Sequence, residues 1–256
     1  MQRMAALTLS DSLVKLAQAH RILAAEGHAD GTLGHVSFRD PEGRGFWLKR
    51  AEIGMDEVAG PADLLLVDFS GRVQEGKGDL HSEWPLHAAV LAGNHDFQSV
   101  VHTHARHASL ISASDVGIEP LTTEGGYFAL DPIRTFDAPR AHIDDSDLAA
   151  AMAAFLGTSP AILIRNHGLV SCGATIEMAT LAALYLERAA VVQLLAVDRA
   201  GHFRAAKPEQ MTGRAMMLRS RNFVEQNFTY YARAARTQTP RTEAIFNAGV
   251  QDGFAT

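Results

Sequence analysis

The chain has 256 residues, of which 47% are hydrophobic and 20% charged, and its formal net charge is −6 at pH 7. This composition is that of an ordinary folded protein with enough residues to bury a sizeable core, and it excludes a disordered chain. Because the net charge is acidic and no run of lysines and arginines occurs, neither a nucleic acid nor an anionic membrane is expected as a partner.

Cysteine content and hydropathy limit the possibilities further. Cys172 is the only cysteine, so no intramolecular disulfide can form and any metal site has to be built from His, Asp and Glu. The first 18 residues lack the long apolar core of a signal peptide. The most apolar later stretch, residues 181–197, is interrupted by Glu187 and Arg188, so no membrane span is expected. These features predict a cytoplasmic protein.

The first half of the chain alternates between helical and strand-like patterns. Apolar residues recur at helical spacing over 13–27, where Ser10 or Asp11 can cap the helix and Gly27 can end it. The following patterns predict, in order, hairpins at 34–50 and 63–76, a helix at 83–93 capped by Ser82, a strand at 97–105 and a helix at 106–114.

The second half is predicted to be mostly helical. Its patterns predict a helix at 144–157, a strand, turn and strand at 161–173, a long helix at 175–201 and a further helix at about 214–235. No internal repeat or linker divides the chain, so residues 1–256 are expected to form one domain. Because most strands are joined as hairpins rather than through helices, the α/β class is expected without a regular parallel sheet.

The stretch VVHTHARHA, residues 100–108, places three histidines in nine positions. Side chains alternate between the faces of a strand, so His102 and His104 are expected to point to one side and Thr103 to the other. Two neutral imidazoles side by side on a rigid strand suit a divalent metal. Two strand-end histidines that each form hydrogen bonds elsewhere are an equally good interpretation, so the pair by itself defines no site.

Two further residues match a metal centre in type and context. His167 ends an apolar strand and precedes Gly168, which lets the backbone turn sharply at a cleft. Glu83 falls in the first turn of a predicted helix, where the helix dipole favours the carboxylate form and a nearby metal would favour it further. Each has an ordinary alternative: a turn histidine that faces solvent, and a glutamate that serves only the helix dipole.

The chain contains no contiguous zinc motif such as His-Glu-x-x-His. The order and spacing of Glu83, the two histidines of the strand and His167 instead resemble the class II aldolase/adducin family, and within it the fuculose-phosphate aldolase type. The resemblance implies a single α/β domain with a central, mainly antiparallel sheet flanked by helices. The matching blocks cover most of residues 10–200 and read GTLGHVSFR (31–39), HSEWPLHAAVLAGNHDFQSVVHTHARHA (81–108), ILIRNHGLVSCGATIEMA (162–179) and ERAAVVQLLA (187–196).

The resemblance also implies the composition of the site. His102, His104 and His167 would be the metal ligands, and Glu83 would either complete the coordination or act as the catalytic acid/base. The metal would be Zn²⁺ in the first place, with Mn²⁺, Co²⁺ or Mg²⁺ as alternatives. Family enzymes assemble as tetramers with active sites between subunits, so a homotetramer is expected, with residues from about 221 to 256 contributing to the subunit contacts.

The chain departs from the family's sugar-phosphate enzymes at the phosphate-binding loops. Where those enzymes have Gly-Asn, Thr-Gly and Ser-Ser, this chain has Gly34-His35, Ile53-Gly54 and His81-Ser82. A sugar phosphate is therefore not the expected substrate. Gly34, His35, His81 and Ser82 are instead predicted to bind the substrate, with the two histidines protonated so that they hold a carboxylate.

Other positions leave alternatives open. Lys49 and Arg50 either bind the same carboxylate or are solvated charges at a strand end. The family's interfacial tyrosine has no obvious equivalent: Glu124 falls near its position, and Tyr127 follows. Tyr230 and Tyr231 either close a neighbouring subunit's site or pack as buried aromatic residues.

A metal held by three neutral histidines keeps its positive charge and open positions, and it can act as a Lewis acid on an enolate formed when a carbon–carbon bond breaks. Glu83 is the nearest candidate for the proton transfer. We therefore predict a lyase that cleaves a small hydroxy-carbonyl or hydroxy-carboxylate compound by aldol chemistry. Decarboxylation of a hydroxylated acid, including an aromatic one, is the near alternative. A non-catalytic adducin-like scaffold is the alternative from another class of protein. A sugar-phosphate epimerase is a further alternative, and the altered phosphate-binding loops argue against it.

Overall fold

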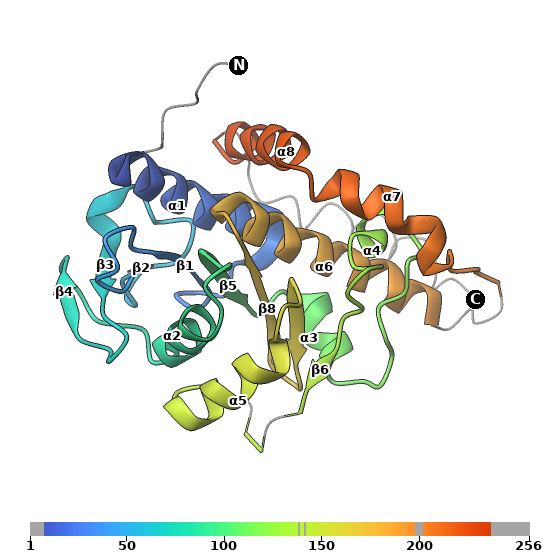
Figure 1. The fold of residues 1–256 in the computed structure, drawn as a ribbon, viewed down its shortest axis with the longest axis horizontal. Helices are drawn as coiled ribbons and strands as arrows, with labels where there is room; N and C mark the ends of the chain where they lie inside the picture. Colours follow the sequence, from blue (N-terminus) through green and yellow to red (C-terminus); the bar gives the residue numbers. More distant parts are fainter. Residues whose placement is uncertain (1–7, 138, 141, 198–201, 237–256) are drawn as a thin grey trace, which may run out of the picture.

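The computed structural model describes residues 8–137, 139–140, 142–197 and 202–236. Its centre is an eight-stranded sheet in the order β4-β3-β2-β1-β5-β8-β7-β6 (Figure 1). The neighbouring strands pair antiparallel, except for β6 and β7, which run parallel. The expected mainly antiparallel sheet is therefore confirmed. The strands are β1 His35–Arg39, β2 Phe46–Lys49, β3 Leu64–Val67, β4 Val73–Glu75, β5 Ser99–Thr103, β6 Thr135–Phe136, β7 Ala161–Ile164 and β8 Gly168–Gly173.

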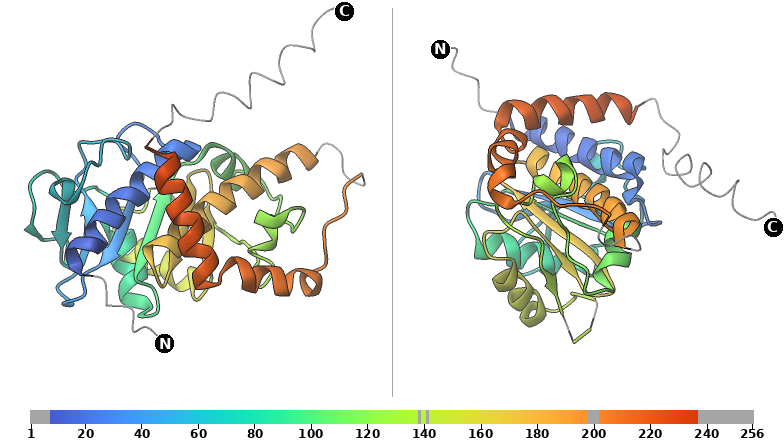
Figure 2. Two further views of the ribbon diagram at one scale, coloured as in Figure 1. Left: turned by 90° about the horizontal axis from the view of Figure 1, so that it is seen from above. Right: turned by 90° about the vertical axis from the view of Figure 1, so that its right-hand side faces the viewer.

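Helices cover both faces of the sheet, as the end-on view in Figure 2 shows. One face packs against α1, α3 and α6, with α8 lying over α1 and α6, and the other face packs against α2 and α5. Strand side chains alternate between the two cores, so that Val101 joins the first and its neighbour Val100 the second. The helices are α1 Leu9–Leu23, η1 Ala24–His28, η2 Pro61–Asp63, α2 Trp84–Gly93, α3 Arg106–Ser112, α4 Thr123–Gly126, α5 Ser146–Leu156, α6 Ile176–Val197, α7 Pro208–Leu218 and α8 Arg221–Ala234.

Two helices begin at other residues than expected. Thr8, rather than Ser10 or Asp11, caps α1, because its hydroxyl accepts from the backbone N–H of Asp11 while the Asp11 carboxylate accepts from the N–H of Thr8. Glu83, rather than Ser82, is the N-cap of α2, and its side chain makes no capping hydrogen bond. The carboxylate of Glu83 is thereby left available for other partners.

The helix expected at about 214–235 is two helices. Arg219 ends α7 in a fixed position, because its guanidinium donates to the carbonyl of Tyr127 and pairs with Asp131 at 2.7 Å. Ser220 then adopts an extended conformation, with φ −66° and ψ 141°, and α8 begins in a new direction. Of the segment predicted to form subunit contacts, residues 237–256 lie outside the described residues.

The longest described helix, α6, has the length and hydropathy of a membrane-spanning helix. However, 67% of its most apolar 18 residues are buried inside the fold, where it packs beneath the sheet. Ala179, Ala183 and Leu186 on its expected apolar face are all fully buried. It therefore serves as the central core helix of the domain.

Strand register places several polar residues on the α2 side of the sheet. His35 on β1 pairs directly with His102 on β5, and Ser37 pairs with Val100. Paired residues of antiparallel strands share one face, and Val100 belongs to the core beneath α2. His35, Ser37 and His102 therefore face the same helix, whose first turn carries Glu83 and His87.

Candidate active site

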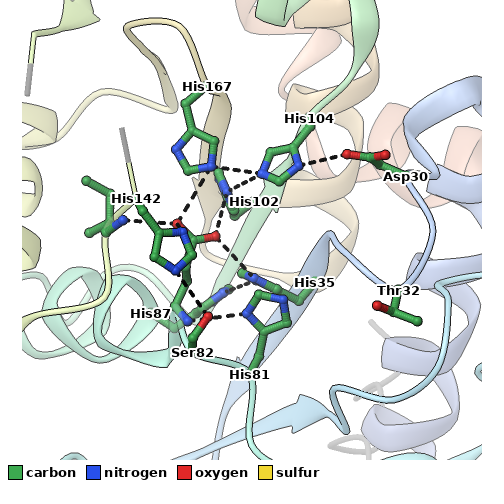
Figure 3. A network of polar contacts seen from close by, with 12 residues as sticks. Asp30, Thr32, His35, His81, Ser82, His87, His102, His104, His142 and His167 are labelled. Atoms are coloured by element: carbon green, nitrogen blue, oxygen red, sulfur yellow. Dashed lines mark hydrogen bonds and ion pairs between the residues drawn. The ribbon is translucent and has the colours of Figure 1, made fainter. Parts of the chain in front are cut away.

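Four side chains from three parts of the chain converge at one end of the sheet (Figure 3). The Nε2 atom of His104 lies 3.2 Å from that of His102 and 2.9 Å from that of His167. The carboxylate of Glu83 approaches to 3.2 Å from Nε2 of His102 and 3.7 Å from Nε2 of His167. The potential ligand atoms of all four residues lie within 4.8 Å of one another.

Backbone geometry at two strand ends produces this convergence. β5 ends at Thr103, so His104 lies just beyond the strand. This differs from the sequence pattern, which predicts His104 on the strand itself. Asn166, in the turn between β7 and β8, has φ 56°, a left-handed conformation that Asn tolerates better than most residues. Gly168 follows the turn, and a Cβ there would lie 2.4 Å from the carbonyl oxygen of Thr103. Glycine at 168 thus allows the His167 turn to approach the His104 segment.

Hydrogen bonds on the far side of two rings define their tautomers. Nδ1 of His102 lies 2.9 Å from the carbonyl oxygen of Leu169, and Nδ1 of His104 lies 3.0 Å from the Asp30 carboxylate. Because both partners only accept, each ring donates from Nδ1–H and presents the lone pair of Nε2 to the site when neutral. Hydrogen bonds of this kind orient metal-binding histidines.

The arrangement fits a divalent metal. Two Nε2 lone pairs that face each other at 3.2 Å repel unless a cation lies between them. The Nε2 separations of 2.9 and 3.2 Å are close to the roughly 3.3 Å expected between nitrogens that bind one tetrahedral zinc at about 2.0–2.1 Å. His102 and His104 therefore have the atom type and tautomer of metal ligands, and His167 brings a third Nε2 atom to a matching distance from His104.

Glu83 is a buried carboxylate, only 1% exposed, surrounded by donors. Its Oε1 accepts from the backbone N–H of Ile143 at 3.0 Å and lies 3.3 Å from Nδ1 of His142. Burial raises the pKa of Glu83, but the charge and hydrogen bond of His102, followed by His167 and the Ile143 N–H, outweigh that effect and hold this pKa well below its usual range. The residue is therefore ionised at neutral pH.

A second group of residues lies on the other side of Glu83. Nε2 of His35 is 3.9 Å from Oε2 of Glu83, and the rings of His35 and His81 meet edge to face with centroids 4.0 Å apart. Ser82 lies at the entrance, where its hydroxyl is 3.2 Å from Nε2 of the half-exposed His142. Gly34 precedes β1 with φ 77° and packs against Met55 and Thr103, so it shapes the backbone next to His35.

The expectation that His35 and His81 are protonated is wrong. Both are buried, and burial is the largest cause of their lowered pKa values. For His35 the pKa lies well below 6.5, and for His81 it falls to about 4, with the nearby charge of Lys49 as a further cause for both. Both side chains are consequently neutral imidazoles at pH 7.

Lys49 and Arg50 do not reach into the site as carboxylate ligands. Lys49 is fully buried, and its ammonium donates to the carbonyl oxygens of Thr32 at 2.7 Å and Ile53 at 2.8 Å. Burial lowers the pKa of Lys49 to about 8. Arg50 pairs with Asp63 at 3.3 Å. Lys49 therefore affects the site through its charge rather than by contact.

The tyrosines lie outside the cluster. Tyr127 is buried and packs against Phe128 and Tyr185. Tyr231 is also buried, and its hydroxyl accepts from Arg188 at 2.7 Å, whereas Tyr230 is 46% exposed. Aromatic packing, the alternative left open for this pair, therefore describes Tyr231.

Sequence reasoning missed three polar residues that the structure brings to the site, Asp30, Ser37 and His142. It treated a fourth, His87, as a secondary or structural histidine rather than a ligand. His87 bridges Ser37 and His35, with Nδ1 2.7 Å from the Ser37 hydroxyl and Nε2 2.6 Å from Nδ1 of His35. The available signal was helical spacing, since His87 lies four residues after Glu83 and on the same side of α2. Asp30 and His142 lie in loops, for which no periodicity exists.

The fold and the four converging residues define a class of protein. The protein-family model described as class II aldolase and adducin N-terminal domain matches residues 14–194 of this chain. This chain belongs to the class II aldolase/adducin family.

Individual members of the family show which enzymes this chain is most usefully compared with. The 3,4-dihydroxyphthalate decarboxylase of Arthrobacter keyseri is 29% identical over 216 residues, 76% of this chain and 82% of that protein. A protein of the same name from Terrabacter sp. (strain DBF63) is 32% identical over 191 residues, 70% of this chain and 78% of its own length. The fold matches L-fuculose 1-phosphate aldolase from Glaciozyma antarctica PI12 with a TM-score of 0.75 and 24% identity, covering 92% of this chain and 94% of that one. These two sequence relatives are named as decarboxylases and not as sugar-phosphate enzymes, in agreement with the altered phosphate-binding loops.

Proposed function

We propose that this protein is a cytoplasmic, metal-dependent lyase that decarboxylates a hydroxylated aromatic carboxylic acid. The observation that carries the proposal is the convergence of three imidazole Nε2 atoms, from His102, His104 and His167, beside the ionised carboxylate of Glu83. The two relatives named 3,4-dihydroxyphthalate decarboxylase support this reaction type. Their substrate is, by its name, a benzene ring with two neighbouring hydroxyls and two neighbouring carboxylates.

His102, His104 and His167 would hold the metal, Zn²⁺ in the first place and Mn²⁺, Co²⁺ or Mg²⁺ as alternatives. When bound, the metal would hold neighbouring substrate oxygens and withdraw electron density from the ring. Asp30 and the carbonyl of Leu169 keep the rings of His104 and His102 in the tautomer that the site requires. Glu83 would either complete the coordination or move protons.

Glu83 can account for every proton in the reaction. Its carboxylate takes the proton of a ring hydroxyl and gives it to the ring carbon that carries the departing carboxylate. The bond from that carbon to the carboxylate then breaks, its electron pair returns to the ring and to the phenolate oxygen, and carbon dioxide leaves. Because Glu83 is buried, water does not compete for the proton that it carries.

The test is direct. Purified protein, loaded separately with each of the four metals, is incubated with 3,4-dihydroxyphthalate, and carbon dioxide and dihydroxybenzoate are measured. We expect equal amounts of both products with at least one metal and none after chelation. If hydroxylated aromatic acids, including this one, release no carbon dioxide with any of the metals, the proposal is wrong.

Retro-aldol cleavage of a small hydroxy-carbonyl compound is the second candidate, because the same Glu83 and three imidazoles would serve an enolate. Aldehyde release from a hydroxy-ketone, without carbon dioxide, would favour it. A carboxylated substrate should then react faster than its phosphorylated analogue, since His35, Ile53 and His81 replace the phosphate-binding residues. A non-catalytic scaffold has no need for the four converging side chains.

We further propose a homotetramer. Large apolar side chains are exposed on the described surface, and such exposure is typical of subunit contacts. They include Leu195 at 72%, Met216 at 64%, Leu110 at 61% and Phe203 at 54%. Leu110 lies on α3, which begins two residues after His104, so a subunit contact there would lie close to the site.

A further inference from the structure

The histidines on the two sides of the site present the same ring nitrogen, Nε2, but in opposite protonation states. On the metal side, the Nδ1 bonds of His102 and His104 leave lone pairs at Nε2, as described above. On the other side, the hydrogen bonds of His35 and His81 can be followed in the same way. The result identifies what kind of group these two rings can hold.

The tautomer of His35 follows from a buried chain, Ser37–His87–His35. The Ser37 hydroxyl lies 2.7 Å from Nδ1 of His87, and Nε2 of His87 lies 2.6 Å from Nδ1 of His35. All three side chains are fully buried. If the Ser37 O–H donates to His87, then Nε2–H of His87 donates to His35, and His35 carries its own proton on Nε2.

The opposite direction of hydrogen-bond donation, from His35 toward Ser37, is unfavourable at both ends of this chain of side chains. His87 would then donate to Ser37, whose hydroxyl proton would have no acceptor among the described residues. At the other end, a lone pair on Nε2 of His35 would face a carboxylate oxygen of Glu83, Oε2, at 3.9 Å. The first direction satisfies Ser37 and turns an N–H of His35 toward that carboxylate. Nε2 of His35 is therefore a buried donor, and it has no hydrogen-bond partner in the described structure.

His81 presents the same kind of atom. Its Nδ1 accepts from the backbone N–H of Glu83 at 3.3 Å, so the proton of the neutral ring is on Nε2. The ammonium of Lys49 adds a positive charge nearby, and no carboxylate of the described residues lies within ion-pair distance of it. Two ring N–H donors beside a buried cation suit an anionic oxygen and do not suit a second metal ion.

We infer that His35 and His81 form a donor pair for the carboxylate that the substrate keeps, and that Ser37 and His87 are positioning residues that hold His35 in its donor tautomer. This inference rests on the proposed function, because it assigns the second anionic group of a hydroxylated aromatic acid to this donor pair. The ring hydroxyls lie toward the three-histidine side. The departing carboxylate lies beside Glu83.

Two probes separate the pocket from the metal side: catechol, which has the two hydroxyls, and 3,4-dihydroxybenzoate, which adds one carboxylate. Their dissociation constants for zinc-loaded protein are measured by calorimetry. We expect 3,4-dihydroxybenzoate to bind at least tenfold more tightly than catechol, since a hydrogen bond to a charged group is worth more than a neutral one. In His35→Leu this advantage should fall below threefold, with the affinity for catechol unchanged.

The positioning residues need their own variants. Ser37→Ala should reduce the carboxylate advantage at least threefold, and Ser37→Thr, which keeps the hydroxyl, should restore it. Ser99→Ala is the matched control, because Ser99 is equally buried on the neighbouring strand and donates only to the carbonyl of Ser37. It should leave the advantage intact. Equal effects of Ser37→Ala and Ser99→Ala would show that Ser37 is only structural and would overturn its positioning role.

The outcomes distinguish the two proposals. If catechol binds the zinc-loaded protein and the carboxylate adds no affinity, the donor pair is wrong while the metal site stands. If catechol does not bind to the zinc-loaded protein at all, the proposed function fails. His35→Asn keeps a side-chain N–H. If this variant retains at least half of the affinity advantage of 3,4-dihydroxybenzoate over catechol while His35→Leu loses all of it, the donor role of His35 is supported.

Discussion

Nε2 of His104 and Nε2 of His167 lie 2.9 Å apart, although the two residues are separated by 63 positions in the chain. The first lies just past the end of β5, and the second occupies the turn that enters β8, the strand paired with β5. Because the pairing brings these two ends together, the proposed metal centre depends on the register of β5 and β8. Variants that leave the strands intact can therefore test the centre by itself.

Replacing one proposed ligand should remove the metal. We expect the wild-type protein to retain about one zinc ion per chain after dialysis, and His102→Ala to retain less than a tenth of that amount, since two histidines seldom suffice for tight binding. His95→Ala is the control, because His95 is exposed and outside the cluster. Elemental analysis gives the metal content. Full zinc occupancy in His102→Ala would contradict the ligand assignment.

Replacing the proposed proton carrier should affect turnover more than metal. In Glu83→Gln the three imidazoles remain, so zinc should be retained, while turnover should fall by about 10²–10⁴-fold, the usual contribution of a positioned acid/base group. Metal content and the rate of carbon dioxide release are measured on the same sample. Loss of the zinc with the activity would instead assign Glu83 to the coordination sphere.

Asp30 should support the metal indirectly. Asp30→Asn leaves His104 with a weaker acceptor at Nδ1, and the zinc dissociation constant should rise by about tenfold. We expect the low end of the usual range because the Asp30 side chain is 53% exposed and solvent screens its charge. Competition with a chromogenic chelator measures the constant. The exposed Asp96 provides the control, and an equal effect of Asp96→Asn would show that only net charge matters.

Stability at acidic pH should reflect His20. This fully buried ring lies 2.9 Å from the Leu16 carbonyl through Nδ1 and accepts from the Val36 N–H through Nε2. Burial lowers its pKa from 6.5 to about 3. The unfolded chain therefore binds this proton first, so the stability present above pH 6.5 is lost as the pH falls toward 3.

The comparison with His20→Gln isolates this effect, because glutamine does not titrate and the other histidines cancel. The free energy of unfolding of the wild type, minus that of the variant, should decrease by about 1 kcal/mol between pH 7.5 and 5.5. Urea unfolding at both pH values measures the difference. A difference that stays constant would mean that His20 is not neutral in the folded protein.

Assembly is tested by mass in solution. We expect light scattering to give four chain masses at micromolar concentration, and Leu195→Lys to give a smaller species, because it places a charge on the most exposed large apolar side chain of the described surface. Val73→Lys on the edge strand β4 is the control, since Val73 is 37% exposed and lies on a different element. A monomeric wild type would refute the tetramer.

The sequence alone determined the class of fold and the most distinctive residues of the site. Hairpin patterns at 34–50 and 63–76 and the apolar strand-turn-strand at 161–173 predicted strands joined mostly as hairpins, because alternation of side chains is a local property. The resemblance to the class II aldolase/adducin family implied the central, mainly antiparallel sheet. The blocks around Glu83, His102 and His167 indicated the family. Local patterns were less accurate at the ends of elements, where Thr8 and Glu83 begin the helices and a tertiary contact of Arg219 separates α7 from α8.

Only the tertiary structure decided the state of the histidines. The sequence offered His35 and His81 as charged anion ligands, but burial, of His35 on the sheet face beneath α2 and of His81 in the loop before α2, lowers the pKa of both and keeps them neutral. Whether a neutral ring presents a lone pair or an N–H depends on the partner of its other nitrogen. Those partners, such as Asp30 for His104 and His87 for His35, come from distant segments and are brought together by packing alone.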